Sequence, residues 1–271
     1  AEKESTMEYL KTFWSRRYLL EELVKKGIKL KYRRSYLGIL WSLLEPILTT
    51  IVLTIVFGTL FDNSNKTFPV YILSGRLLYS FFSSGTKACA KSIRSNAGMI
   101  KKVYVPKYLY PMSSVLFNYI IFLISLIVMI PLMVFCHVKP TWSLLLVILP
   151  LILLLMITFG VGMVLATVTV FFRDMEYLWD VVLMLVMYCS AIFYKISSMG
   201  QGLILIKLNP LYGIISNFRA VLLEGHSMFN SYGYGVSNLK LFAYSGTCSV
   251  VLLIFGIYVF KKNQDKFILH I

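Results

Sequence analysis

The side chains of this sequence that could do chemistry are few, and none of them forms a catalytic or metal-binding arrangement. The four cysteines, Cys89, Cys136, Cys189 and Cys248, lie far apart and lack any CxxC or Cys/His spacing. The three histidines do not cluster, and no GxxxxGK[ST] or GxGxxG stretch is present to bind phosphates. We therefore expect this chain to be no enzyme and to contain no metal site and no cofactor.

One carboxylate is unusual, because Glu45 and Pro46 lie side by side in the apolar stretch SYLGILWSLLEPILTTIVLTIVFGTLF, residues 35–61. Ionisable side chains inside a membrane are costly and are usually kept for function. Pro46 has no N–H and frees the carbonyl of Ser42, so we expect the chain to bend there. We interpret the pair as the joint between an N-terminal helix and the first span. The candidate partners of the Glu45 carboxylate are Arg33, Arg34 and Arg173.

The elements that position these residues are membrane spans. Of the 271 residues, 58% are hydrophobic and 14% are charged, whereas soluble domains carry about 25% charged residues. The sequence predicts an all-α polytopic membrane protein with a single transmembrane domain over residues 1–271. The net charge of +15 comes from Lys and Arg between the apolar runs. That pattern indicates the positive-inside rule and no nucleic-acid binding.

The apolar runs predict six membrane-spanning helices, each near the roughly 20 residues that cross about 30 Å of hydrocarbon. The second run is weak, because it contains Arg76 and several serines, and Pro131 and Pro150 can bend the third and fourth. The predicted spans cover residues 40–61, 69–86, 108–136, 142–172, 177–194 and 241–260.

Residues 202–225 do not fit this scheme. Lys207 and Arg219 interrupt the stretch and Asn209-Pro210 breaks it, which favours an external re-entrant helical hairpin over a seventh span. With six spans and a cytoplasmic N-terminus, 20 of the 27 Lys and Arg residues fall in cytoplasmic segments. A seventh span would place the basic C-terminus outside, so we expect both termini to be cytoplasmic.

Two basic segments flank the first two spans. Residues 7–35 place Leu20, Val24 and Gly27 on one stripe with lysines beside it, which favours an interfacial amphipathic helix over a soluble or calmodulin-target-like one. The loop of residues 87–107 repeats Ile93, Ala97 and Ile100 at helical spacing. Such a helix can dock into the groove of a partner or rest on anionic lipid, and the sequence leaves both open.

Four stretches carry a resemblance to a known family. They are KYRRSYLGILWSLLEPIL (31–48), NAGMIKKVYVPKYLYP (96–111), GMVLATVTVFFRDMEYLW (162–179) and LNPLYGIISNFRAVLLEG (208–225). In this order they resemble the ABC-2 type permeases of polysaccharide and polyol-phosphate exporters, the membrane subunits that export O-antigen, capsule or wall teichoic acid. The missing phosphate loop agrees with the resemblance, because the ATPase of that family is a separate polypeptide.

The resemblance implies a homodimer in the bacterial plasma (inner) membrane, bound to two ABC ATPase subunits that carry MgATP. The implied substrate is a glycan or polyol-phosphate polymer on an undecaprenyl-diphosphate lipid. The implied ATPase-docking residues are Ser92, Ile93, Arg94, Asn96, Ala97, Ile100, Lys101 and Lys102. The implied external gate comprises Asn209, Pro210, Phe218 and Arg219.

Three further groups of residues are candidates, each with an alternative. Tyr188, Phe193 and Tyr194 suit a polymer channel, because aromatic faces bind sugars, although helix packing explains them as well. Phe172, Arg173 and Asp174 form an expected inner-face turn that transmits ATPase motion or simply marks the water boundary. A lipid head group would be attracted by Lys25, Lys26, Lys29, Arg33 and Arg34, beside Glu45 and Pro46, although positive-inside bias accounts for the cations too.

Two other functions remain open on the sequence. An ABC-2 exporter of drugs or small lipids would share the architecture and differ in cargo. A membrane scaffold without transport would share only the spans.

Overall fold

The chain is all-helical in the ranges that can be described. The computed structural model describes residues 17–33, 35–60, 65–102, 105–138, 142–194, 206, 208–223 and 238–270. Every element within these ranges is a helix and none is a strand. The all-α prediction is therefore confirmed.

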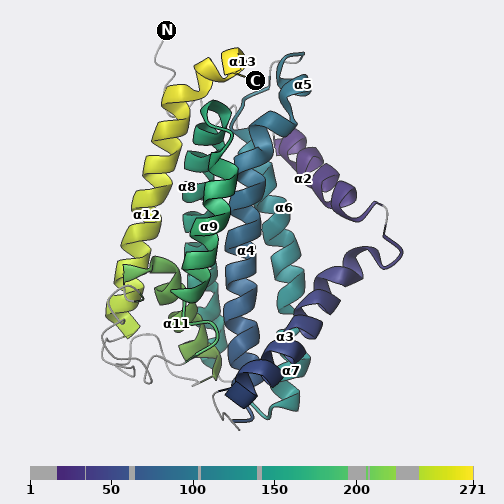
Figure 1. Cartoon of the computed structure of the whole chain (residues 1–271), viewed down its shortest axis with the longest axis vertical. Helices are drawn as coiled ribbons and strands as arrows, with labels where there is room; N and C mark the ends of the chain where they lie inside the picture. Colours follow the sequence, from purple (N-terminus) through teal and green to yellow (C-terminus); the bar gives the residue numbers. More distant parts are fainter. Residues whose placement is uncertain are drawn as a thin grey trace.

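The long helices form one bundle around α4, and from α3 to α9 successive long helices run in opposite directions along it (Figure 1). Helices α6 and α8 pack directly on α4, and α12 packs on α8. Helix α9 also contacts α4, whereas α3 crosses the bundle at an angle on the side of α6 (Figure 1). The long helices are α2 (Arg17–Tyr32), α3 (Trp41–Leu60), α4 (Phe68–Ser95), α6 (Leu109–Leu126), α8 (Ile148–Phe171), α9 (Met175–Tyr188), α11 (Pro210–Leu223) and α12 (Asn238–Asn263).

Short helices and parts of longer ones close the two ends of the bundle. At one end lie α5, α13 and the start of α2, and at the other end lie α7 and α11 (Figure 1). This arrangement agrees with α11 being too short to cross the bundle, since 14 residues rise only about 21 Å. The short elements are η1 (Gly38–Leu40), α5 (Ala97–Ile100), α7 (Met129–Phe135), η2 (Trp142–Val147), η4 (Gln264–Lys266) and α13 (Phe267–His270).

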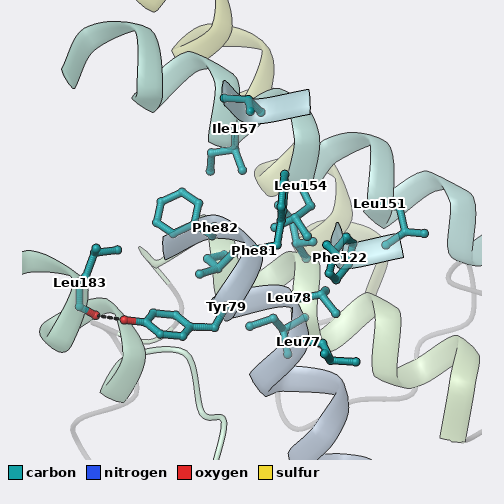
Figure 2. Close-up of a cluster of buried hydrophobic side chains, with 14 of the residues drawn as sticks. Leu77, Leu78, Tyr79, Phe81, Phe82, Phe122, Leu151, Leu154, Ile157 and Leu183 are labelled. Atoms are coloured by element: carbon teal, nitrogen blue, oxygen red, sulfur yellow. Dashed lines mark hydrogen bonds between the residues drawn. The ribbon is translucent and has the colours of Figure 1, made fainter. Parts of the chain in front are cut away.

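Helix α4 is central because it buries side chains on more than one face. Pro69 stands in its first turn, where the missing N–H costs no hydrogen bond. Figure 2 shows its Leu77, Leu78, Phe81 and Phe82 among side chains of α6 and α8, with Tyr79 pointing toward α9. Neighbouring helices therefore shield α4 from lipid, which explains how a span with several serines is accommodated.

Four helices are long and apolar enough to cross a membrane. They are Gly38–Leu60, Leu109–Phe135, Leu144–Phe171 and Leu239–His270. Helix α4 carries Arg76, Lys87, Lys91 and Arg94, which lower its hydropathy, and α9 has only 14 residues. The expected count of six spans is thus supported for four helices, and α4 and α9 would have to cross with the help of their neighbours.

Several predicted boundaries are wrong, each for a local reason. Helix α4 continues past Thr86 to Ser95, because the cations that suggested a loop pair with α9. The third span is interrupted at Ile127 and Val128, four and three residues before Pro131, which cannot donate to the carbonyl of Ile127. Pro150 likewise follows the 3₁₀ segment η2 and stands in the first turn of α8.

Helices α8 and α12 approach each other backbone to backbone. A Cβ added to Gly160 would lie 2.6 Å from the carbonyl oxygen of Leu252, and one added to Gly256 would meet the backbone of Gly160. Small residues at such crossings allow the dense packing that holds helices together in lipid. The crossing fixes α12, although α12 follows a stretch of the chain that lies outside the described residues.

Candidate functional site

A cavity of about 400 Å³ lies between α2, α3, α4 and α6. Three charged side chains line it, namely Lys31 from α2, Glu45 from α3 and Arg76 from α4. In the part of the chain that the structure describes, none of the three takes part in an ion pair. Lys31 and Glu45 are exposed and Arg76 is half-buried, and the convergence of three charged side chains from three helices on one cavity marks a candidate site for a polar ligand.

The neutral walls of the cavity combine hydrogen-bonding groups with aromatic faces. The hydroxyl and amide groups come from Ser35, Thr49, Ser80, Ser84 and Asn118. The ring faces come from Trp41, Phe81 and Phe122. The cavity can therefore satisfy a ligand that has both hydroxyl groups and an apolar part.

Glu45 faces a different cation from those expected. Its charge acts on Lys31, where removal of the ammonium group from water lowers the pKa and Glu45 opposes that shift. Burial also raises the pKa of the Tyr32 phenol in the same wall. Of the expected partners, Arg33 and Arg173 are exposed, with no ion pair to a described residue, and Arg34 lies outside the described residues. The partner prediction missed Lys31, which lies at the end of α2, just before the turn into α3, and lines the same cavity as Glu45.

Pro46 has a specific structural partner on another helix. The carbonyl of Ser42, which would bond the N–H of residue 46 in an ordinary helix, accepts a hydrogen bond from Ser125 Oγ on α6 at 2.8 Å. Both serines are buried, at 6% exposure each. The imino acid therefore leaves an acceptor that ties α3 to α6 beside the cavity.

The joint between α2 and α3 lies before Glu45 and Pro46. The chain turns at Ser35–Gly38, where Gly38 has a φ of +52° that other residues adopt at a cost. The Gly38 N–H donates to Ser35 Oγ at 3.2 Å, and Leu40 N–H donates to the Leu37 carbonyl at 3.0 Å. The interpretation of Glu45-Pro46 as the joint is wrong, since the pair lies in the first turns of α3.

The lysines expected to attract a lipid head group lie on the exposed side of α2. Lys25, Lys26 and Lys29 are exposed, and Lys25 pairs with Glu22 at 3.0 Å. The apolar stripe is confirmed by the burial of Leu20 and Val24. However, α2 packs against α6. Less of its apolar stripe is therefore free to enter lipid than the prediction of an interfacial helix requires.

The segment expected to dock on an ATPase is built from two helices. Asn96 ends α4 with a non-helical backbone and donates from Nδ2 to the Ser92 carbonyl at 2.8 Å, and α5 begins at Ala97. The expectation of one helix over residues 92–102 is therefore wrong. Three of the predicted docking side chains are buried in the chain, namely Ser92, Ile93 and Ile100. Those that remain exposed or half-exposed are Arg94, Asn96, Ala97, Lys101 and Lys102.

The turn after α8 has the expected backbone. Met175 N–H donates to the Phe172 carbonyl and Glu176 N–H donates to the Arg173 carbonyl, both at 3.2 Å. The side chains of Phe172, Arg173 and Asp174 are exposed. They form a tight turn, and the ion pairs near it are made by residues further along α9.

A ladder of ion pairs joins α9 to the second half of α4. Glu176 accepts from Arg94 at 2.8 Å and lies 3.6 Å from Lys91, and Asp180 pairs with Lys87 at 2.7 Å. Most of these groups are partly exposed, so each pair adds at most about 1 kcal/mol. Together they explain why α4 stays helical through its basic stretch. The ladder links the end of α4, next to α5, with the first half of α9.

Arg219 is buried at the opposite end of the bundle and has neutral partners. Its Nη1 donates to the Ala191 carbonyl at 2.9 Å, and its Nη2 donates to the carbonyls of Tyr71 at 2.9 Å and Ile192 at 3.2 Å. Its Nε donates to Ser74 Oγ at 3.3 Å, and the guanidinium carbon stands 3.5 Å from the centre of the Tyr71 ring. No described carboxylate pairs with it. Arg219 thus fastens α11 to α4 and to the segment after α9.

The other predicted gate residues belong to the same region. Asn209 accepts from Leu211 N–H at 3.0 Å and donates to Ser190 Oγ at 2.9 Å, so it caps the start of α11. Pro210 occupies the first position of that helix, which suits proline. Phe218 is a core residue at 2% exposure. The first half of the expected hairpin lies largely outside the described residues, so the hairpin remains a prediction.

The predicted channel aromatics do not share one surface. Tyr188 is 55% exposed on α9, whereas Phe193 is buried and stacks on Phe57 of α3 at a centroid distance of 4.7 Å. Tyr194 is half-buried and donates to the Tyr188 carbonyl at 2.6 Å. Only Tyr188 presents its ring outside the chain, so packing explains Phe193 at least as well as a channel does.

Sequence reasoning missed four residues that carry these sites. Lys31 and Arg76 complete the charged cavity, Tyr71 receives Arg219, and Glu176 receives Arg94. Arg76 and Arg219 were visible as charges in apolar runs, a recognisable sign of function or of an internal partner. Lys31 and Glu176 looked like ordinary boundary charges, and only the packing of distant helices reveals their roles.

Comparisons with known proteins cover almost the whole chain. Residues 18–223 match the ABC-2 type transporter family. The chain is 27% identical over 256 residues to the O-antigen export system permease protein RfbA of Myxococcus xanthus, covering 93% of this chain and 94% of that protein. A Klebsiella pneumoniae protein of the same name is 27% identical over 256 residues, with coverage of 92% and 93%. The polysialic acid transport protein KpsM of Escherichia coli is 23% identical over 260 residues, with coverage of 91% and 93%.

The extent of these matches decides the family. The family match covers well over half of the chain, and it includes every helix from α2 to α11. The four stretches that carried the resemblance lie within it or overlap its end. The chain therefore belongs to the ABC-2 type transporter family.

Proposed function

We propose that this chain is the permease subunit of an ABC exporter that moves a lipid-linked polysaccharide or teichoic acid across the bacterial plasma membrane. The observation that carries the proposal is its similarity, over more than nine-tenths of its length, to export permeases named for two different polysaccharides. O-antigen and polysialic acid share little beyond being long glycans, so a common architecture points to polymer export. The polymer would be carried on undecaprenyl diphosphate.

The remaining subunits of the transporter would be a second copy of this chain and separate ATPase chains. Two copies of this permease would form the channel, and two ABC ATPase subunits with MgATP would drive it from the cytoplasm. The exposed residues around α5 support a docking site, because they project at the end of the bundle where the basic end of α4 also lies (Figure 1). Six spans with both termini cytoplasmic would place α11 at the external end.

The test uses the full chain together with the ABC ATPase encoded nearest to its gene. We expect the two to co-purify, and we expect reconstituted complex to hydrolyse ATP faster when polyprenyl-diphosphate-linked glycan is added. Deletion of the gene should remove the polymer from the cell surface and leave its lipid-linked precursor inside the cell. Stimulation by small lipids or drugs with no response to glycan lipid would instead assign a different cargo. A chain that binds no ATPase and whose loss leaves the surface glycan unchanged would overturn the proposal.

A further inference from the structure

The chain leaves helix α9 through a strained residue. Ala191 has a φ of +47°, a left-handed conformation that residues with a side chain adopt at a cost and that glycine adopts freely. Glycine is the usual residue where a helix ends in this conformation. Ala191 is also 1% exposed, and its neighbours Ser190 and Ile192 are fully buried. An unfavourable backbone conformation persists in the interior only when surrounding groups hold it there.

The groups that hold this backbone come from α4 and α11. The carbonyl of Ala191 accepts a hydrogen bond from Arg219 Nη1 at 2.9 Å, and the Tyr71 hydroxyl stands 3.1 Å from the same oxygen. The carbonyl of Ile192 accepts from Arg219 Nη2 at 3.2 Å. The Tyr71 hydroxyl also reaches the carbonyl of Tyr194 at 2.8 Å. Donors from two helices therefore fix the peptide groups around the strained residue.

Gly75 makes room for the guanidinium group of Arg219. Gly75 lies one helical turn after Tyr71, so both residues belong to the same face of α4. A Cβ added to Gly75 would collide with Arg219 Nη2 and would lie 3.3 Å from Cγ2 of Ile192. The missing side chain thus allows the cation to lie between α4 and the segment after α9.

The segment of residues 189–194 also contacts α3 and the start of α11. The Phe193 ring stacks on Phe57 of α3 at a centroid distance of 4.7 Å. Asn209 Nδ2 donates to the carbonyl of Cys189 at 3.2 Å. Movement of this one segment would therefore free the end of α9 from α3, α4 and α11 together.

We propose that Arg219, Tyr71 and Gly75 form a latch that holds residues 189–194 in a strained closed conformation. When the latch releases, Ala191 relaxes to a negative φ, and this end of the bundle opens locally while α8 stays folded. The strain at Ala191 makes the closed state less stable than its hydrogen bonds alone would, so the segment is poised to open. The inference concerns this chain alone and does not rest on its cargo or on an ATPase.

The test measures amide hydrogen exchange of the purified full chain by mass spectrometry. Exchange of buried amides in residues 189–194 requires opening of the segment, so its rate reports the population of the open state. The buried helix α8 reports global unfolding. We expect Arg219→Met to speed exchange in residues 189–194 about tenfold or more, as loss of hydrogen bonds to a charged group does, with a much smaller change in α8. Gly75→Ala should act in the same direction, because its Cβ displaces the guanidinium.

Ala191→Gly keeps the test decisive if the other variants fail to fold. It removes the cost of the positive φ, so it should slow exchange in residues 189–194 about fivefold or more. The matched controls are Arg76→Met, which leaves the latch donors in place, and Gly98→Ala, where an added Cβ meets nothing within 4 Å. Both should leave exchange in the segment unchanged.

Three results would overturn the latch. The first is an equal acceleration in α8 and in residues 189–194 of Arg219→Met, which would make Arg219 a residue of global stability only. The second is faster exchange in Ala191→Gly, which would show that the alanine is unstrained. The third is a control variant that opens the segment as much as Arg219→Met does.

Discussion

The hydrogen bond from Ser125 on α6 to the Ser42 carbonyl on α3 gives the sharpest test of how Pro46 is accommodated. Ser125→Ala removes the donor and leaves that carbonyl without its partner, because Pro46 has no N–H to offer. The Ser125 hydroxyl can also reach the Ile121 carbonyl at 2.9 Å, but that bond lies within its own helix. Both serines are almost fully buried, so water does not readily replace the lost bond.

The expected magnitude follows from burial and from the membrane setting. A buried acceptor left without a donor costs about 1–3 kcal/mol in soluble proteins, and hydrogen bonds between membrane helices average about 0.6 kcal/mol with a maximum near 1.7. We expect Ser125→Ala to lower the free energy of unfolding by about 1 kcal/mol. In a Pro46→Ala background the new N–H of residue 46 can bond the Ser42 carbonyl, so the same substitution should then cost almost nothing.

The assay is the unfolding of four purified proteins, the parent, each single variant and the double variant, by SDS titration in mixed micelles. The control is Ser113→Ala, a buried serine of α6 whose hydroxyl bonds only the Tyr110 carbonyl of its own helix. Its effect should be the same with or without Pro46. Equal losses for Ser125→Ala in both backgrounds, within about 0.3 kcal/mol, would refute the reasoning, since independent sites are additive.

Three further outcomes are expected. Gly256→Leu should separate α8 from α12 and lower the thermal stability of the protein. Gly246→Ala on the same helix should leave the stability nearly unchanged, because a Cβ added there makes only ordinary contacts. An unchanged stability of Gly256→Leu would contradict the close crossing of the two helices. Arg219→Met should cost about 2–5 kcal/mol of unfolding free energy, because it strips charge-assisted bonds from three carbonyls, two of them in buried bonds. An unchanged melting temperature would show that these carbonyls find other donors. Ile100→Asp should reduce both stability and ATPase co-purification, while Lys102→Glu should reduce co-purification alone; if only Ile100→Asp acts, docking does not use the exposed side of this segment.

Much of the candidate site was visible in the sequence as charged residues and a proline within apolar runs. Glu45, Pro46 and Arg76 each interrupt an apolar run, and the cost of such residues in lipid already predicted a functional or structural reason for them. The family resemblance rested on local stretches and was confirmed by the comparisons. What the sequence lacked was the identity of partners, because the turn between α2 and α3 decides whether the Glu45 charge acts on Lys31, and Ser125 meets Ser42 across more than eighty residues.

The predicted end of the second span was wrong because the basic residues after it fit either a cytoplasmic loop or a helix paired with another helix. Lys87, Lys91 and Arg94 predicted a cytoplasmic loop, yet Asp180 and Glu176 pair with them and keep α4 helical. A charge pattern along one segment cannot show whether its basic side chains are solvated by water, bound to lipid head groups or paired with carboxylates of another helix. Helical spacing and the family resemblance made Ile93 and Ile100 docking candidates, and both side chains are buried in the chain.

The sequence by itself determined the class of this protein, because long apolar runs without charged residues can cross lipid only when their backbone groups are paired, as they are in helices. It also determined the family, through motifs that survive at modest identity. Tertiary structure alone decided which polar residues converge, since Lys31, Glu45 and Arg76 come from three helices whose packing angles no local pattern encodes. It likewise decided that Arg219 is satisfied by carbonyl groups and the Tyr71 ring, because such partners appear only when separate backbones meet.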